Sequence, residues 1–342
     1  MRHLVLAVMS FSVVLSACGG SNGGTNPDPN PDAPALTGQK FTATWGPVTV
    51  APGTENTQCI TVRLSNDHDI KVHQLHNVLS AGSHHLIVYR DDAATVESLT
   101  PTDCNPFAGA LNPSAMVAPI MITQKDDDAL TLPDGVAYTL KANQMVRIEM
   151  HFINSTDADL QVQATSEFYE AEPTTIRDEA NILFIGSPDI DIAAGQSLTV
   201  EEFFAPSRAN LDLSTAKFFA ITGHTHQFGT DMQVQTAPTS GGTRTSVYAP
   251  MPFQWAEPLT QTHNPAFMLP AGGGFNFKCD YQNTSAARVQ FGESATDEMC
   301  FFWAYYYPSK GAHVCVHTSQ YGGVDICCPE AGPTLCGRLS TP

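Results

Sequence analysis

The chain has 342 residues, enough for two domains, and a formal net charge of -18 with 15% charged residues. An acidic surface of this kind repels phosphate backbones, which argues against nucleic-acid binding. An acidic surface suits the binding of cations. The alternative is that its carboxylates are only solvated. Short apolar runs with 25 Gly and 24 Pro favour an all-β architecture.

The N-terminal residues have the features of an export signal. Residues 1–17 combine a short charged start with an apolar segment too brief to span a bilayer. The next residue, Cys18, resembles the lipidated cysteine of bacterial lipoproteins, and plain secretion with cleavage near Ala17 is the alternative. Residues 18–38, rich in Gly, Asn, Pro and Asp, predict a flexible tether. We therefore expect a lipid anchor in the bacterial outer membrane, facing the periplasm or cell surface, as the only membrane contact.

Two blocks of short strands follow, at residues 39–172 and 176–308, and predict two β-sandwiches in series. Residues 309–342 form a Cys-rich tail. Nine cysteines behind an export signal imply an oxidising compartment and a disulfide framework, with an even number left if one is set aside.

A His-x-His pair follows an apolar run in the second block. Thr222 and Gly223 precede His224 and His226. On a strand, side chains two residues apart leave the same face, so both imidazoles could reach one ion. Such a pair is more often an ordinary pair of histidines, and its weight comes from the other donors in the chain.

The first block offers a doublet, His84 and His85, and a third histidine, His151. Neighbours on a regular strand face opposite ways, so joint ligation by the doublet requires a bulge or a strongly twisted strand end. Otherwise one of the two is a structural histidine. Glu149 is two residues before His151 and shares its strand face. It is a candidate partner for an imidazole, with a solvated acid as the alternative.

Met299 is the discriminating donor, because a thioether is a poor ligand for zinc and a good one for Cu(I). A methionine that only fills core is the alternative. If Cys300 points inward in a disulfide, Met299 points outward. Aromatic residues alternate after it, and Trp303, two residues past Phe301, is the candidate wall of an apolar or aromatic substrate pocket.

These elements occur in a set order: Ser-His-His-Leu at 83–86, Glu-Met-His at 149–151, His-Thr-His at 224–226 and Asp-Glu-Met-Cys at 297–300. The chain, over roughly residues 45–308, resembles the copper type II ascorbate-dependent monooxygenases. Peptidylglycine α-hydroxylating monooxygenase and dopamine β-monooxygenase belong to that family.

The resemblance implies two jelly-roll sandwiches, each with one copper, separated by an interdomain cleft. His84, His85 and His151 would hold an electron-transfer copper. His224, His226 and Met299 would hold the copper at which oxygen binds, and would be the catalytic residues. The resemblance also implies two disulfides, Cys59–Cys104 and Cys279–Cys300. We expect the four tail cysteines to pair among themselves, namely Cys315, Cys327, Cys328 and Cys336.

The chain departs from the family around the substrate. Thr222 stands where the peptide-amidating enzymes have an arginine that grips a carboxylate, and Phe301 and Trp303 replace an asparagine and a tyrosine. A C-terminal glycine substrate is therefore not expected. We predict a monomeric hydroxylase of a small apolar or aromatic molecule, using O2 and ascorbate or another one-electron reductant. The alternatives are a non-catalytic copper-binding lipoprotein and a purely structural one.

Overall fold

The computed structural model describes residues 38–105, 117–319, 322–329 and 336. The expected signal peptide, Cys18 and nearly all of the tether lie outside these residues. Strands dominate the described part, with two short 3-10 helices, η1 (Pro173–Thr175) and η2 (Pro206–Ala209). Within those ranges, no helix is both long and apolar enough to cross a membrane. The predicted all-β class is confirmed.

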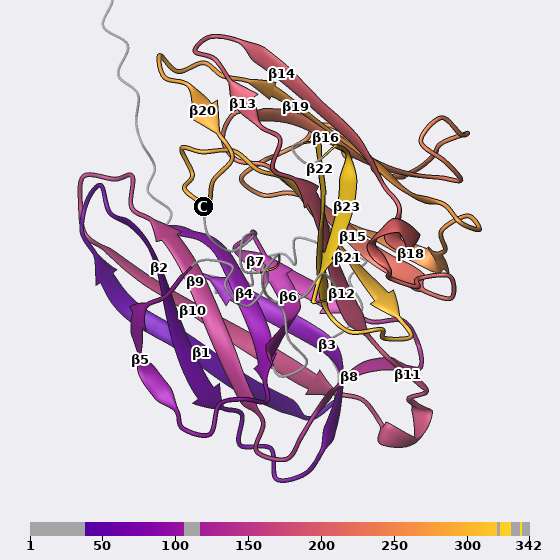
Figure 1. The fold of residues 1–342 in the computed structure, drawn as a ribbon. Helices are drawn as coiled ribbons and strands as arrows, with labels where there is room; N and C mark the ends of the chain where they lie inside the picture. The colour runs from indigo at the N-terminus through magenta and orange to yellow at the C-terminus, as the bar shows by residue number, and fades with distance from the viewer. Residues whose placement is uncertain (1–37, 106–116, 320–321, 330–335, 337–342) are drawn as a thin grey trace, which may run out of the picture. The chain divides into compact units, whose positions relative to one another are not determined.

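The first sandwich consists of two sheets (Figure 1). One has the order β1-β10-β3-β8, with β7 on β3 and β11 on β8, and the other has the order β5-β2-β9-β4-β6. The strands are β1 (Lys40–Val50), β2 (Glu55–Arg63), β3 (Ile70–Leu79), β4 (Ser83–Asp91), β5 (Ser98–Asp103), β6 (Val117–Thr123), β7 (Asp127–Thr131), β8 (Val136–Leu140), β9 (Met145–Ile153), β10 (Leu160–Glu170) and β11 (Asp178–Glu179).

The second sandwich is built from the sheets β18-β15-β21-β12-β22-β23 and β14-β19-β16-β17, with a small β13-β20 pair beside them. Its strands are β12 (Asn181–Ser187), β13 (Asp191–Ile192), β14 (Ser197–Phe204), β15 (Lys217–His224), β16 (Gly229–Ala237), β17 (Thr245–Tyr248), β18 (Thr260–Phe267), β19 (Gly274–Gln282), β20 (Val289–Gln290), β21 (Cys300–Tyr307), β22 (His313–Thr318) and β23 (Val324–Cys328).

Both sandwiches have the same strand order. Without the extra strands β5, β7 and β11, the first has eight strands, and without β13 and β20 and the tail strands, so does the second. Counted along the chain, each set of eight forms one sheet of order 1-8-3-6 and one of order 2-7-4-5. This double Greek key is a jelly roll, so the two-jelly-roll prediction is confirmed.

The disulfide-tied tail also contributes to a sheet. Strand β22 pairs in parallel with β12, and β23 pairs antiparallel with β22. The tail therefore extends the sheet that contains β15 and β21. The tail has little apolar content overall, which hid these strands from the sequence, yet the apolar residues of β22, Val314 and Val316, are buried.

Four disulfides lie in the described residues, and they are Cys59–Cys104, Cys279–Cys300, Cys315–Cys327 and Cys328–Cys336. The second one joins β19 to β21, and so connects the two sheets of the second sandwich beside Met299. The first two close sequence separations of 45 and 21 residues, for which the chain-entropy estimate is about 3–4 kcal/mol each.

Strand β21 has two apolar faces. Cys300 and Phe302 belong to the core of the second sandwich, whereas Met299, Phe301 and Trp303 belong to the apolar cluster that contains the core of the first. A direct hydrogen bond accompanies this packing, since the backbone N–H of Ile122 in the first sandwich donates to the Tyr305 hydroxyl at 3.1 Å. The face of β21 that carries Met299 is therefore turned toward the first sandwich.

Candidate metal centre

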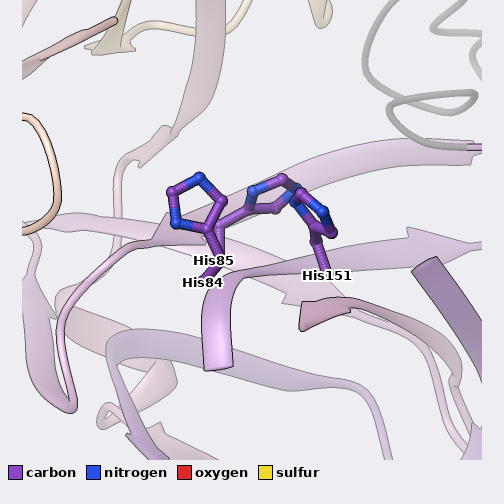
Figure 2. A group of neighbouring side chains, drawn as sticks. All are labelled: His84, His85 and His151. Atoms are coloured by element: carbon purple, nitrogen blue, oxygen red, sulfur yellow. The ribbon is translucent and has the colours of Figure 1, made fainter. Parts of the chain in front are cut away.

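The histidine doublet and His151 form one group, because the strand that carries the doublet is irregular. In the pairing of β4 with β9, Ser83 lies opposite Phe152 and His85 opposite His151, with a register shift between Ser83 and His85. The shift leaves His84 as an additional residue, as in a β-bulge, which re-aims a side chain. The three histidines offer ring nitrogens that all lie within 4.8 Å of one another (Figure 2).

These three imidazoles are buried, with exposed fractions of 8% for His84, 2% for His85 and 4% for His151. Burial, and then the neighbouring imidazoles, lower the pKa of His84 to about 3 and that of His85 well below its usual value. At neutral pH both rings are neutral, which is the form that binds a metal. Three buried imidazoles suit copper or zinc.

His151 is hydrogen-bonded to a carboxylate that the sequence did not reveal. Glu55, the first residue of β2, accepts a hydrogen bond from His151 Nε2 at 3.0 Å. This bond is the largest cause of a lowered Glu55 pKa of about 2. Glu149, the predicted candidate, is fully buried and accepts from the Tyr89 hydroxyl at 2.9 Å.

The second group lies where β15 ends and β21 begins. His224 is the last residue of β15, and His226 lies beyond the strand. Their ring centroids are 5.0 Å apart. Phe301 lies opposite His224 in the register of β15 with β21, and Met299, two residues earlier, therefore projects from the same face. Met299 is 1% exposed and belongs to the same apolar cluster as Phe301. Register places only His224 beside Phe301, whereas His226 and Met299 lie just outside the two strands.

His226 is held by the residues just before Met299. Its Nδ1 donates to the Asp297 carbonyl at 3.1 Å. The fully buried Glu298 carboxylate accepts the backbone N–H of His226 at 2.9 Å and that of Phe228 at 2.7 Å. Burial raises the pKa of Glu298 to about 7, against the lowering by these backbone donors. The pKa of His226 itself is lowered to about 4, mainly by burial.

The two groups are neighbours. The ring centroids of His84 and His226 are 6.3 Å apart. Gln124 of the first sandwich accepts a hydrogen bond from His224 Nδ1 at 2.9 Å, and the ring of Trp255, between β17 and β18, lies 6.1 Å from that of His84. Each group therefore has a neighbour from the other sandwich, Trp255 beside His84 and Gln124 bonded to His224.

The predicted pocket residues line this region. Trp303 is buried and stacks on Phe184, with 6.0 Å between ring centroids, and lies 6.0 Å from the ring of His224. Phe301 also stacks on Phe184, with 5.0 Å between their ring centroids. The hydroxyl of Thr222 is hydrogen-bonded to that of Thr260 at 2.9 Å. The surroundings of His224 are therefore aromatic and neutral.

The second sandwich matches a known protein family. Residues 178–324 match the family described as the C-terminal domain of copper type II ascorbate-dependent monooxygenases. The matched segment contains His224, His226 and Met299. No curated protein matches this chain.

Solved structures resemble the chain only distantly. The major capsid protein P2 of bacteriophage PM2 is 8% identical, with 80% of this chain and 100% of that chain covered and a TM-score of 0.35. The broad bean stain virus structure is 11% identical, with 84% and 93% covered and a TM-score of 0.32. Scores this low carry no argument about function.

Proposed function

We propose that the protein is a copper-dependent monooxygenase that hydroxylates a C–H bond of a small apolar or aromatic substrate with O2 and an external reductant such as ascorbate. One observation carries the proposal. A segment that matches the C-terminal domain of copper monooxygenases presents His224, His226 and Met299 beside a separate buried group of three histidines.

The donor sets fit copper. His84, His85 and His151 would hold one ion through three neutral imidazoles, and His224, His226 and Met299 would hold another through two imidazoles and a thioether. The thioether favours Cu(I) over zinc. Copper bound there would supply the one-electron chemistry that O2 reduction and C–H hydroxylation require.

The side chains around the donors set their state and their surroundings. Burial lowers the pKa of His224 and of His226 and so favours their neutral forms. Bonds to Gln124 and to the Asp297 carbonyl leave Nε2 of each ring as the nitrogen with a lone pair. Trp303 and Phe184 form an apolar wall next to His224. Since Thr222 is neutral, this wall supports an apolar or aromatic substrate over an anionic one.

The remaining expectations belong to the same proposal. A lipidated Cys18 and a tether at residues 18–38 would place a monomeric enzyme at the outer membrane, with a small molecule and O2 as its partners. Because the chain is acidic, we do not expect nucleic acid as a partner.

Copper titration followed by paramagnetic resonance tests the proposal, together with O2 uptake in the presence of ascorbate and a panel of apolar and aromatic compounds. We expect saturation at two coppers and uptake that depends on substrate. Copper binding without turnover would favour a non-catalytic copper-binding lipoprotein, and a protein that binds no copper would favour a structural one.

A further inference from the structure

One carboxylate oxygen contacts both sandwiches. Glu55 Oε1 accepts from His151 Nε2 at 3.0 Å in the first sandwich, and from the backbone N–H of Ala295 at 3.0 Å in the second. The hydroxyl of Ser294 approaches the same oxygen at 3.5 Å. The Glu55 side chain is 31% exposed, so it lies at the margin of the contact between the sandwiches.

The first of these bonds selects a nitrogen of His151. A neutral imidazole has one N–H and one lone pair, and the bond to the carboxylate keeps the proton on Nε2. Nδ1 is then the nitrogen that can bind an ion together with His84 and His85. A carboxylate in this position fixes both the tautomer and the rotation of a ligand ring.

The second bond holds a turn that supports His226. In this turn the backbone N–H of Asp297 donates to the Ser294 carbonyl at 2.9 Å. The Asp297 carbonyl then accepts from His226 Nδ1 at 3.1 Å. A further bond ties the turn to the histidine loop, since Gln227 Nε2 donates to the Ala295 carbonyl at 3.1 Å.

We propose that Glu55 is a positioning residue shared by the two histidine groups. Its carboxylate orients His151 directly and His226 through the turn at 294–297. Binding at either group therefore depends on the same contact between the sandwiches. The proposal rests on the proposed function only for the identity of the metal, because the hydrogen bonds belong to the metal-free protein.

Nitrogen-15 resonances of the histidine rings in the metal-free full chain provide the first test, with His151 and His226 each assigned by single substitution. We expect the Nε2–H form for His151 and the Nδ1–H form for His226. Glu55→Ala should convert both rings to mixtures of tautomers, and Glu55→Gln, which keeps an acceptor oxygen, should restore much of the wild-type pattern. Glu97→Ala is the matched control, since Glu97 is an exposed carboxylate of the first sandwich that accepts the Arg63 backbone N–H at 2.8 Å.

Cu(I) competition with a chelator provides the second test. Loss of a residue that orients metal ligands typically costs about 10–100-fold in affinity, and we expect a loss of this size at both sites in Glu55→Ala, with none in Glu97→Ala. Unchanged tautomers in Glu55→Ala would overturn the proposal, and so would a loss confined to the His151 site. Failure of the proposed function would show separately, as wild-type protein that binds no copper while the tautomer test still gives its result.

Discussion

The two jelly rolls share one strand order, yet their candidate ligands occupy different strands. In the first sandwich the histidines lie within β4 and β9, two neighbouring strands of the 2-7-4-5 sheet. In the second they lie at the end of β15 and beside the start of β21, in the 1-8-3-6 sheet. Topology therefore does not determine where ligands sit. What the two groups share is a sheet face directed toward the other sandwich.

The difference has an energetic consequence. The His85 and His151 backbones are held by the ladder between β4 and β9, and a bulge adds His84. In contrast, His226 lies outside any strand and relies on Asp297 and Glu298 for its position. We therefore expect the second group to be the more sensitive to changes in the residues that surround the ligands.

The largest effect should come from Met299→Leu. Leucine keeps most of the side-chain volume, so the stability cost should stay below about 1.5 kcal/mol, while the soft donor is lost. Turnover should fall by orders of magnitude, and the three-histidine group should retain its copper. Oxygen uptake, copper stoichiometry and the melting temperature measure the three effects.

Met299→Ala and Met299→His sharpen this test. If Met299 only fills core, Met299→Ala should cost about 2–5 kcal/mol with unchanged copper stoichiometry. If it is a ligand, Met299→His should restore metal occupancy but favour Cu(II) and slow turnover. Full oxygen-dependent turnover in Met299→Leu would exclude Met299 as a functional ligand.

The next effect is a loss of one copper in His151→Ala. Removal of one of three imidazoles leaves an incomplete site, so stoichiometry should fall from two to one. The matched change His226→Ala should remove the other copper and leave the first. Paramagnetic resonance of the two variants should give two different spectra, and a single common spectrum would show that the sites are not independent.

Acid should destabilise the metal-free protein. The unfolded chain protonates its histidines near pH 6.5, whereas burial holds the pKa of His84 at about 3 and that of His226 at about 4. The unfolded state thus binds more protons between these values, so the free energy of unfolding falls as pH drops from about 6.5 to 4. The slope is at most about 1.4 kcal/mol per pH unit for each histidine.

Urea denaturation at several pH values measures this slope. Glu298 contributes in the opposite sense, because burial raises its pKa from 4.5 to about 7. The folded state then binds more protons at this group, so its contribution to the free energy of unfolding is lost as pH rises from about 4.5 to 7. Comparison with His84→Asn isolates the histidine, because only the wild type has the titrating ring. An equal slope in both proteins would show that His84 is not buried in its neutral form.

Sequence reasoning predicted the candidate ligands because each lies in a short, recognisable motif, and the resemblance to the copper monooxygenases grouped them into two sets. It could not identify Glu55, which is 96 residues from His151, or Gln124, which is 100 residues from His224. Such partners meet only when two sandwiches pack together, and no local pattern marks them. The sequence also placed His226 on the same strand as His224, whereas the strand ends at His224. Beyond it, the Glu298 carboxylate accepts the backbone N–H groups of His226 and Phe228 that a neighbouring strand would otherwise bind.

The smallest effect, and the sharpest comparison of the two groups, should come from Glu298→Gln. Both carboxylate oxygens accept backbone N–H groups, from His226 and from Phe228. An amide has one oxygen, so its NH2 group must face a backbone donor. Above the Glu298 pKa of about 7 the carboxylate is charged. Hydrogen bonds to charged groups contribute about 1.5–3 kcal/mol, and part of this should be lost from stability there. Because the loop that Glu298 holds carries His226, Cu(I) affinity should weaken at the second site alone. Gln124→Ala is the informative companion, since it removes a partner of His224 without touching the loop. If Glu298→Gln lowers the melting temperature while Cu(I) affinity is unchanged at both sites, Glu298 serves the fold alone, and the second group is held as firmly as the strand-borne first.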